Sequence, residues 1–393
     1  MDFILSNPLF LPSVMIVVII LGFPLLSLYI VLTERKVLAD LQVRLGPMRV
    51  GPHGLLQPIA DALKLFLKED IIPADADKFL FWFAPCISTF TALTAFSVLP
   101  FTNTLRVADV NVGILIVSAM SSVGILGIIL GGWSSNSHYA LLGALRSAAQ
   151  LVSYEVALAL AVLSGIMAAG SLSMVQIVKN QQAQGIWYGF DNFGFMLIPA
   201  MVYLIAGVAE TNRIPFDLPE AESELVAGYH TEYSGLRWAL YMMAEYAAIF
   251  VMCGVMVTVF WGGWLRPFPN VGWLEIPMNY GMPVLVFAGS GLASIPLALR
   301  LRDRIPQVGL IALALALIFV GALFLIPAVN AAAISFFWFM FKVAVLVYIL
   351  IWVRGTFPRF RYDQLMNIGW KVMIPIALAA IFVNALIGMA RAA

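Results

Sequence analysis

Residues 111–132, NVGILIVSAMSSVGILGIILGG, contain no charged side chain and decide the class of this protein. A helix needs about 20 mainly apolar residues to cross the hydrocarbon core of a bilayer. In lipid, the backbone groups must be hydrogen-bonded within the segment, which favours a helix over a single strand. The stretch therefore predicts a transmembrane helix, and the spacing of Gly127 and Gly131 predicts close packing against a neighbouring helix.

Similar apolar runs recur along the whole chain. Its 393 residues are 62% hydrophobic and 11% charged, whereas soluble domains contain about 25% charged residues. The further runs lie at about 12–32, 79–101, 149–169, 194–211, 236–261, 281–299, 306–328, 334–353 and 370–390. We therefore expect an all-α polytopic membrane protein, a single transmembrane domain over residues 1–393 with about ten transmembrane helices.

Few residues of this chain could hold a cofactor. Cys86 and Cys253 lie in separate apolar runs, and His53, His138 and His230 lie far apart. Two thiolates cannot hold a cubane iron–sulfur cluster, and the histidines lack the spacing of a zinc site. We expect no metal site and no cofactor bound by this chain alone. The net charge of +1 argues against a nucleic-acid partner.

The basic residues predict the orientation in the membrane. Seventeen of the twenty-two lysines and arginines fall on one side of the predicted bundle. Arg106, Lys179, Arg266 and Arg391 fall on the other side, and Lys342 falls within a span. Because positive charge gathers on the cytoplasmic side, both termini are expected to face outward. The N-terminus has no charged region or cleavage site of a signal peptide, so the first helix should be retained.

Residues 54–68, GLLQPIADALKLFLK, predict an amphipathic helix in the cytoplasmic interface. Gln57, Asp61, Lys64 and Lys68 recur at steps of four, three and four residues, and apolar residues fill the opposite face. Helices of this pattern lie along a bilayer surface rather than across it. Two roles fit the pattern equally well. The helix could anchor the chain at the membrane surface, or it could lie across an opening between transmembrane helices.

Five ionisable residues fall within or at the ends of five separate predicted spans. They are Glu34, Glu155, Glu210, Glu245 and Lys342. A charge at the centre of a spanning helix costs roughly 2.5–3.5 kcal/mol on insertion scales. One such acid could be a paired helix-packing residue, but five on different spans indicate a polar, hydrated seam suited to proton transfer.

The densest group of acids lies in the predicted cytoplasmic loop 210–237, ETNRIPFDLPEAESELVAGYHTEYSGLR. Its six carboxylates, against only two arginines, are Glu210, Asp217, Glu220, Glu222, Glu224 and Glu232. Apolar residues interleave with them, so we expect the loop to fold back against the bundle. Crowded and partly desolvated carboxylates have raised, coupled pKa values, which would let them exchange protons.

Four blocks of sequence resemble a known family. They are TERKVLADLQVRLGPMRVGPHGLLQPIADALKLFLKED (33–70), ALLGALRSAAQLVSYE (140–155), AETNRIPFDLPEAESELVAGYHTEYSGLRWALYMMAEY (209–246) and WVRGTFPRFRYDQLMNIGWK (352–371). The family is that of the H subunits of NADH:quinone oxidoreductase (respiratory complex I), the bacterial counterparts of mitochondrial NADH dehydrogenase subunit 1. The resemblance covers about 10–264 and 335–390.

The resemblance implies a quinone-tunnel subunit of a proton-translocating enzyme in the bacterial inner membrane, where the outward termini expected from the basic residues would be periplasmic. The implied tunnel residues are Glu34, Arg35, Arg44, Asp61, Arg213, Asp217, Glu220 and Glu222, and the implied proton path is Glu155, Glu210, Glu224 and Glu245. Quinone is the implied substrate, and FMN and iron–sulfur clusters are carried by partners. Those partners are the peripheral-arm quinone-site and iron–sulfur subunits, the small membrane subunits and the antiporter-like subunits.

Residues at about 265–333 depart from the family, whose members usually have eight spans. They predict an extra helical hairpin with no charge in its apolar runs and a short basic connection at 300–304. We expect it on the lipid-facing periphery, away from the tunnel and the acidic seam. The alternative is that it covers the bundle where an accessory subunit or a neighbouring antiporter-like subunit binds.

Two rival functions stay open. Related subunits serve membrane hydrogenases and ferredoxin- or coenzyme-driven quinone reductases, and this chain does not reveal which soluble module docks on it. A stand-alone transporter or proton channel would be expected to contain an inverted repeat, and we find no such internal symmetry.

Overall fold

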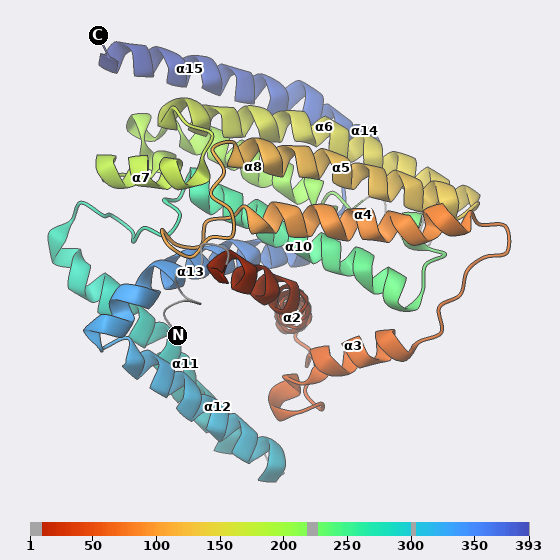
Figure 1. Cartoon of the computed structure of the whole chain (residues 1–393), viewed down its shortest axis with the longest axis horizontal. Coiled ribbons are helices and arrows are strands. Elements are labelled where there is room, and N and C mark those ends of the chain that lie inside the picture. The colour runs from red at the N-terminus through yellow and green to blue at the C-terminus, as the bar shows by residue number, and fades with distance from the viewer. Residues whose placement is uncertain (1–9, 218–226, 300–303, 393) are drawn as a thin grey trace.

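Every regular element in the described part of the chain is a helix. The computed structural model describes residues 10–217, 227–299 and 304–392 (Figure 1). Its long helices are α2 (Phe10–Leu41), α4 (Lys78–Ser97), α5 (Gly113–Ser134), α6 (His138–Ala169), α10 (Gly235–Val259), α11 (Met282–Leu299), α12 (Arg304–Leu323), α13 (Pro327–Thr356) and α15 (Ile374–Ala392). The shorter ones are α3 (Gln57–Leu67), α7 (Met174–Gln184), α8 (Leu197–Glu210) and α14 (Tyr362–Asn367).

Nine helices within the described ranges are long and apolar enough to cross a membrane. The predicted all-α, multi-pass membrane protein is therefore confirmed. The expected tenth span, at 194–211, is the 14-residue helix α8. At about 1.5 Å per residue it is shorter than the about 30 Å hydrocarbon core. It begins only at Leu197 because Asn192 and Phe193, with φ of 52° and 56°, interrupt any earlier start.

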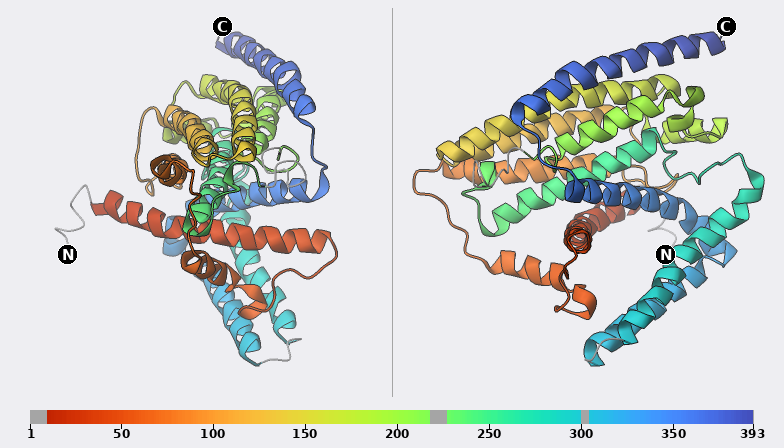
Figure 2. Two further views of the ribbon diagram at one scale, coloured as in Figure 1. Left: turned by 90° about the vertical axis from the view of Figure 1, so that its right-hand side faces the viewer. Right: turned by 180° about the vertical axis from the view of Figure 1, so that it is seen from behind.

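Most of the helices form one main bundle, and α2 and α13 lie across it (Figure 2). α5 packs between α4 and α6, α6 also packs against α8 and α15, and α10 packs against α4. α2 and α13 contact each other and α10, and Figure 2 (left) shows α2 lying across the bundle. The predicted close packing at Gly127 and Gly131 is confirmed. A Cβ at Gly127 would overlap Ser88 of α4, and one at Gly131 would overlap the Tyr241 hydroxyl of α10.

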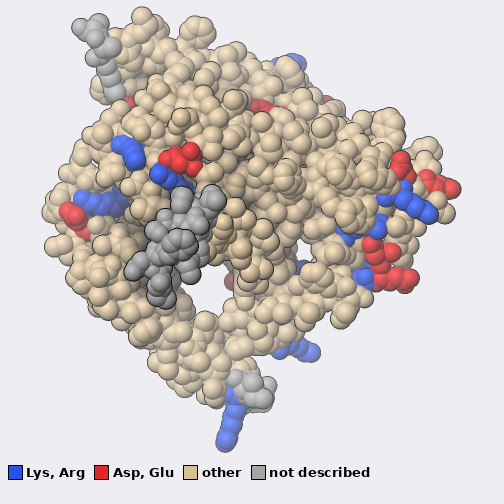
Figure 3. Space-filling view, in the orientation of Figure 1, with Lys and Arg blue, Asp and Glu red and all other residues tan. Residues whose placement is uncertain are grey.

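Charged side chains are sparse on the face of the molecule that Figure 3 shows. In Figure 3 the middle of the face is free of red and blue, which gather at its two sides and at its lower tip. Exposed apolar side chains such as Leu21, Phe90 and Phe382 cover the long helices instead. Such a surface fits lipid rather than water as the surrounding solvent.

The predicted amphipathic helix is α3, which lies apart from the main bundle (Figure 1). On its polar side, Asp61 accepts a hydrogen bond from Gln57 at 2.8 Å and pairs with Arg35 of α2 at 2.7 Å. Its apolar residues Leu63 and Phe66 are exposed. The helix therefore exists as predicted, with an apolar face available to lipid.

The predicted extra hairpin is formed by α11 and α12, which pack against each other. At one end, Phe324 packs against Phe337 and Trp338 of α13. At the other end, α12 contacts the short 3₁₀ turn Pro52–Gly54, just before α3. This contact joins the hairpin to the first signature block, to which Pro52 belongs. Glycine at position 309 leaves the room for this approach. The expected position of the hairpin, away from the quinone tunnel and the acidic seam, stays a prediction.

Candidate functional site

A buried group of charges joins α2, α10 and the segment that follows α8. Nη1 of Arg213 lies 3.7 Å from Oε1 of Glu34, and Nη2 lies 3.8 Å from Oε2 of Glu245. The Arg213 guanidinium also stacks over the ring of Tyr246, 4.3 Å from its centroid. Each of these charged side chains is at most 13% exposed. One arginine thus bridges two acids from helices distant in sequence.

Glu34 has two further partners. Its carboxylate accepts a hydrogen bond of 2.7 Å from the Tyr246 hydroxyl and pairs with Arg354 near the end of α13. A buried carboxylate is tolerated only when it is paired and hydrogen-bonded. These contacts therefore allow a buried charge at Glu34, within α2.

The turn that carries Arg213 is held from α6. The buried side-chain amide of Gln150 donates to the carbonyl oxygens of Ala209 and Phe216, at 2.8 and 2.7 Å. Asn212, inside this turn, adopts a positive φ of 49°, which asparagine tolerates better than most residues. Gln150 thus determines where the turn places Arg213.

Asp217 lies at the end of the same turn. Nη2 of Arg359 donates to its Oδ2 at 3.0 Å, and the Phe360 amide donates to the carbonyl of Pro215 at 3.0 Å. Burial raises the pKa of Asp217 above that of an ordinary aspartate, and the positive charge of Arg359 opposes the rise. The carboxyl group of Asp217 therefore titrates closer to neutral pH than an exposed one.

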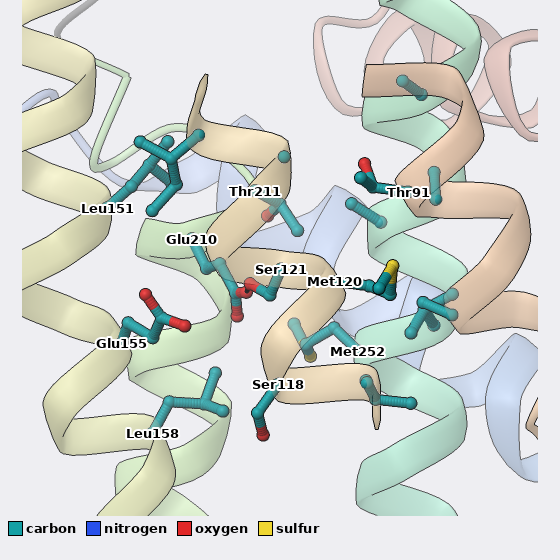
Figure 4. A pocket seen from close by; sticks show the side chains of 18 of the residues that line it. Thr91, Ser118, Met120, Ser121, Leu151, Glu155, Leu158, Glu210, Thr211 and Met252 are labelled. Carbon is teal, nitrogen blue, oxygen red and sulfur yellow. Dashed lines mark hydrogen bonds between the residues drawn. The ribbon is translucent and has the colours of Figure 1, made fainter. Parts of the chain in front are cut away.

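A cavity of about 180 Å³ lies between α4, α5, α6, α8 and α10. Glu155, Glu210 and Glu245 all line it. In Figure 4 the carboxyl groups of Glu155 and Glu210 face each other from different helices. Ser122 donates a hydrogen bond to Glu155, and Ser121 donates one to Glu210. A cavity of this size has room for several waters.

Glu245 belongs both to the cavity and to the charge group. Besides pairing with Arg213, it accepts a hydrogen bond of 2.7 Å from Tyr229, which also lines the cavity. Tyr229 stacks edge-on against His230, with ring centroids 5.0 Å apart. Burial lowers the pKa of His230, and the negative charge of Glu245 opposes this. A continuous polar connection therefore runs from Glu34 through Arg213 and Glu245 into the cavity.

Comparison with known proteins gives the family. A family model described as NADH dehydrogenase matches residues 14–385. The H subunit numbered 2 of the NADH-quinone oxidoreductase of Solibacter usitatus is 65% identical over 389 residues, 99% of each chain. This chain belongs to the family of NADH-quinone oxidoreductase H subunits. The H subunit numbered 1 of Koribacter versatilis is 51% identical over 368 residues, 91% of this chain and 86% of the relative. The H subunit of Rickettsia bellii is 41% identical over 372 residues, 94% of this chain and 91% of the relative.

The structure brings together only part of the tunnel set predicted for this member of the family. Glu34 and Arg213 meet directly, and Asp217 lies on the same turn as Arg213. Arg35 and Asp61 instead pair with each other at the surface, between α2 and α3. Arg44 is exposed and donates to Gln42 at 2.7 Å, so it does not join the charge group.

The predicted proton-path residues Glu155, Glu210 and Glu245 share the cavity. Glu220, Glu222 and Glu224 lie outside the described residues. The described ranges contain no group of three or more His, Cys, Asp or Glu residues that could hold a metal ion. The relatives named above are membrane subunits of an oxidoreductase complex.

Sequence reasoning missed several residues of the site. Arg354 and Arg359 lie in the fourth signature block, one in the last turn of α13 and one just after it, and that position was the available signal. Tyr229 and Tyr246 flank Glu245 in the third block. Their hydroxyls carry no sequence signal, because tyrosine is common in apolar cores as well as in polar networks.

Proposed function

We propose that this chain forms much of the quinone-binding chamber of a proton-translocating NADH:quinone oxidoreductase, and that it couples quinone reduction to proton transfer through buried carboxylates. The observation that carries the proposal is the connection from the Glu34–Arg213–Glu245 group into the cavity. Such paired charges inside a membrane bundle are costly and mark ion pathways.

In this proposal the quinone head group reaches the charge group formed by Glu34, Arg213 and Glu245. Reduction to quinol takes two electrons from a partner's iron–sulfur cluster and two protons from groups in the chamber. Asp217 is suited to supply a proton, because burial raises its pKa. Loss of this proton leaves a negative charge on Asp217. A shift of the Arg213 side chain then balances that charge and changes the pairing of Arg213 with Glu245.

The remaining assignments follow from the same proposal. The tunnel residues are Glu34, Arg213 and Asp217, with Arg35 and Asp61 joining α2 to α3 beside the quinone entrance. Glu155, Glu210 and Glu245 carry protons through the cavity, and Arg44, Glu220, Glu222 and Glu224 stay predictions. FMN and the iron–sulfur clusters belong to the partner subunits of the peripheral arm, and antiporter-like subunits receive the proton signal.

We further propose that the chain lies in the bacterial inner membrane with periplasmic termini. A membrane-impermeant thiol reagent should then reach a cysteine placed at Asn103 in intact spheroplasts. It should reach one placed at His53 only after the membrane is broken. The reverse pattern would overturn the orientation without affecting the family assignment.

A photoreactive quinone tests the chamber in the intact complex. Labelling should fall on this chain, near Glu34 and Arg213, and should be competed away by unmodified quinone. Glu245→Gln should then lower quinone-coupled proton uptake in vesicles, whereas Glu275→Gln should not. Glu275 is a matched control because its side chain is 62% exposed and lies 3.9 Å from Arg266. Labelling confined to other subunits would rule out the chamber.

A further inference from the structure

The α11–α12 hairpin meets the loop before α3 through a close contact. Gly309 of α12 lies directly against Pro52: a Cβ at position 309 would overlap Cγ of Pro52 and lie 3.5 Å from its Cβ. The proline ring is closed and cannot rotate away as a flexible side chain could. Any residue other than glycine at position 309 would therefore push the two segments apart.

The loop is held from its other side by α2. Nζ of Lys36 donates to the carbonyl oxygen of His53. The loop is also tightly turned, since Gly51, His53 and Gly54 have positive φ of 73°, 51° and 74°. The Pro52–Gly54 turn is thus fixed between α2 and the hairpin, and α3 begins directly after it.

The opposite end of α3 is held by the start of α10. The Ser234 hydroxyl accepts from the Ile71 amide at 3.1 Å and donates to the Glu69 carbonyl at 3.3 Å. Arg237 pairs with Asp70 at 3.0 Å. α3 is therefore held at both ends, and the hairpin contributes to the hold at its N-terminal end.

The hairpin bridges the molecule rather than lying flat on it. It packs on α13 at one end and on the Pro52–Gly54 turn at the other. The space-filling view shows an opening between the hairpin and the body of the bundle (Figure 3). The hairpin therefore connects α13 to the turn that precedes α3.

We infer that the hairpin is a positioning element for the quinone entrance. By placing Gly309 against Pro52, it fixes the start of α3, beside which the proposed function puts the quinone entrance. Gly309 touches neither quinone nor reacting groups and acts through Pro52. This inference rests on the proposed quinone chamber.

The test uses the assembled complex in native membranes or proteoliposomes. Gly309→Ala should raise the KM for a long-tailed isoprenoid quinone about threefold or more, with kcat unchanged. The KM for a short-tailed quinone should change less, because it has no long tail that must move past α3. In Gly309→Ala/Pro52→Ala the overlapping Cγ is gone, so the KM should return toward the wild-type value.

Gly289→Ala is the matched control. It makes the same change on α11, where an added Cβ meets nothing within 4 Å, and it gains the same helix propensity. Its KM values should equal those of the wild type. An unchanged KM in Gly309→Ala, or a double variant that does not recover, would overturn the inference.

A cross-link gives a second measurement, which does not depend on whether the Gly309→Ala variant folds and assembles. In Pro52→Cys/Gly309→Cys the Cβ atoms would lie about 3.5 Å apart, within the range that a disulfide requires. Oxidation should join the two positions in the holoenzyme, and failure to join would contradict the contact itself. If the photoreactive quinone labels this chain but Gly309→Ala leaves the KM unchanged, only the hairpin inference fails. If no quinone labels this chain, the chamber fails first and the inference with it.

Discussion

Replacing Arg213 with glutamine removes the cation that lies between two buried carboxylates. Its guanidinium nitrogens lie 3.7 Å from Glu34 and 3.8 Å from Glu245. At an effective dielectric constant of about 20, a pair of unit charges at this separation attracts by about 4 kcal/mol, much of which offsets desolvation. Removing one partner of a buried ion pair costs about 3–5 kcal/mol, because the other charge is left uncompensated.

The two acids should not suffer equally. Glu34 keeps Arg354 and the Tyr246 hydroxyl, whereas Glu245 keeps the hydrogen bond from Tyr229. The loss of electrostatic stabilisation should therefore affect mainly Glu245 and the cavity that it lines. A double variant that also carries Glu245→Gln removes the orphaned charge and should recover thermal stability, but not coupled activity.

The assay is NADH-driven quinone reduction, with proton uptake, in membranes where native gels show the assembled complex. Arg213→Gln should lower the coupled rate at least about tenfold and lower the inactivation temperature. Arg266→Gln is the matched control, because Arg266 is also largely buried and bonds to the carbonyls of Pro269 and Val271, remote from the cavity. If Arg213→Gln kept the wild-type rate and inactivation temperature, the bridging role of Arg213 would be refuted.

Three further predictions concern neighbouring groups. Glu155→Gln and Glu210→Gln keep the shape and the serine hydrogen bonds but remove the titratable group, so proton uptake should fall while assembly is unchanged. Wild-type uptake in both would return the pair to a helix-packing role. Arg359→Gln removes the charge that opposes the raised pKa of Asp217, so that pKa should rise further. Because Asp217 must be protonated to supply a proton, the alkaline limb of the pH profile should move to higher pH. A limb that stayed in place would contradict this. Lys342→Met removes hydrogen bonds of 2.7 and 2.9 Å to backbone carbonyls beyond α10, so it should lower the inactivation temperature without raising the quinone KM. A changed KM with unchanged stability would count against that structural role.

The sequence was sufficient to predict most of the long helices. The length of an apolar run predicts a spanning helix, because in lipid each run must form its backbone hydrogen bonds within itself. This requirement involves only residues that are close in sequence. The amphipathic period of 54–68 likewise predicted α3. The helix at 194–211 came out short because two positive-φ residues interrupt its start, and hydropathy does not report φ. The polar helix α7 was missed because its mean composition resembles a loop.

The partners of each charge were decided by the tertiary structure. Glu34 and Arg35 are neighbours in sequence, yet Glu34 points into the bundle toward Arg213 and Arg35 points outward to Asp61. Which of two adjacent residues faces inward depends on the rotation of α2, and that rotation is set by its packing against α10 and α13. Gly309 on Pro52 is a contact of the same kind. Helical periodicity is local information, whereas the crossing of distant helices is a property of the whole packed bundle, and only that crossing brings such residues together.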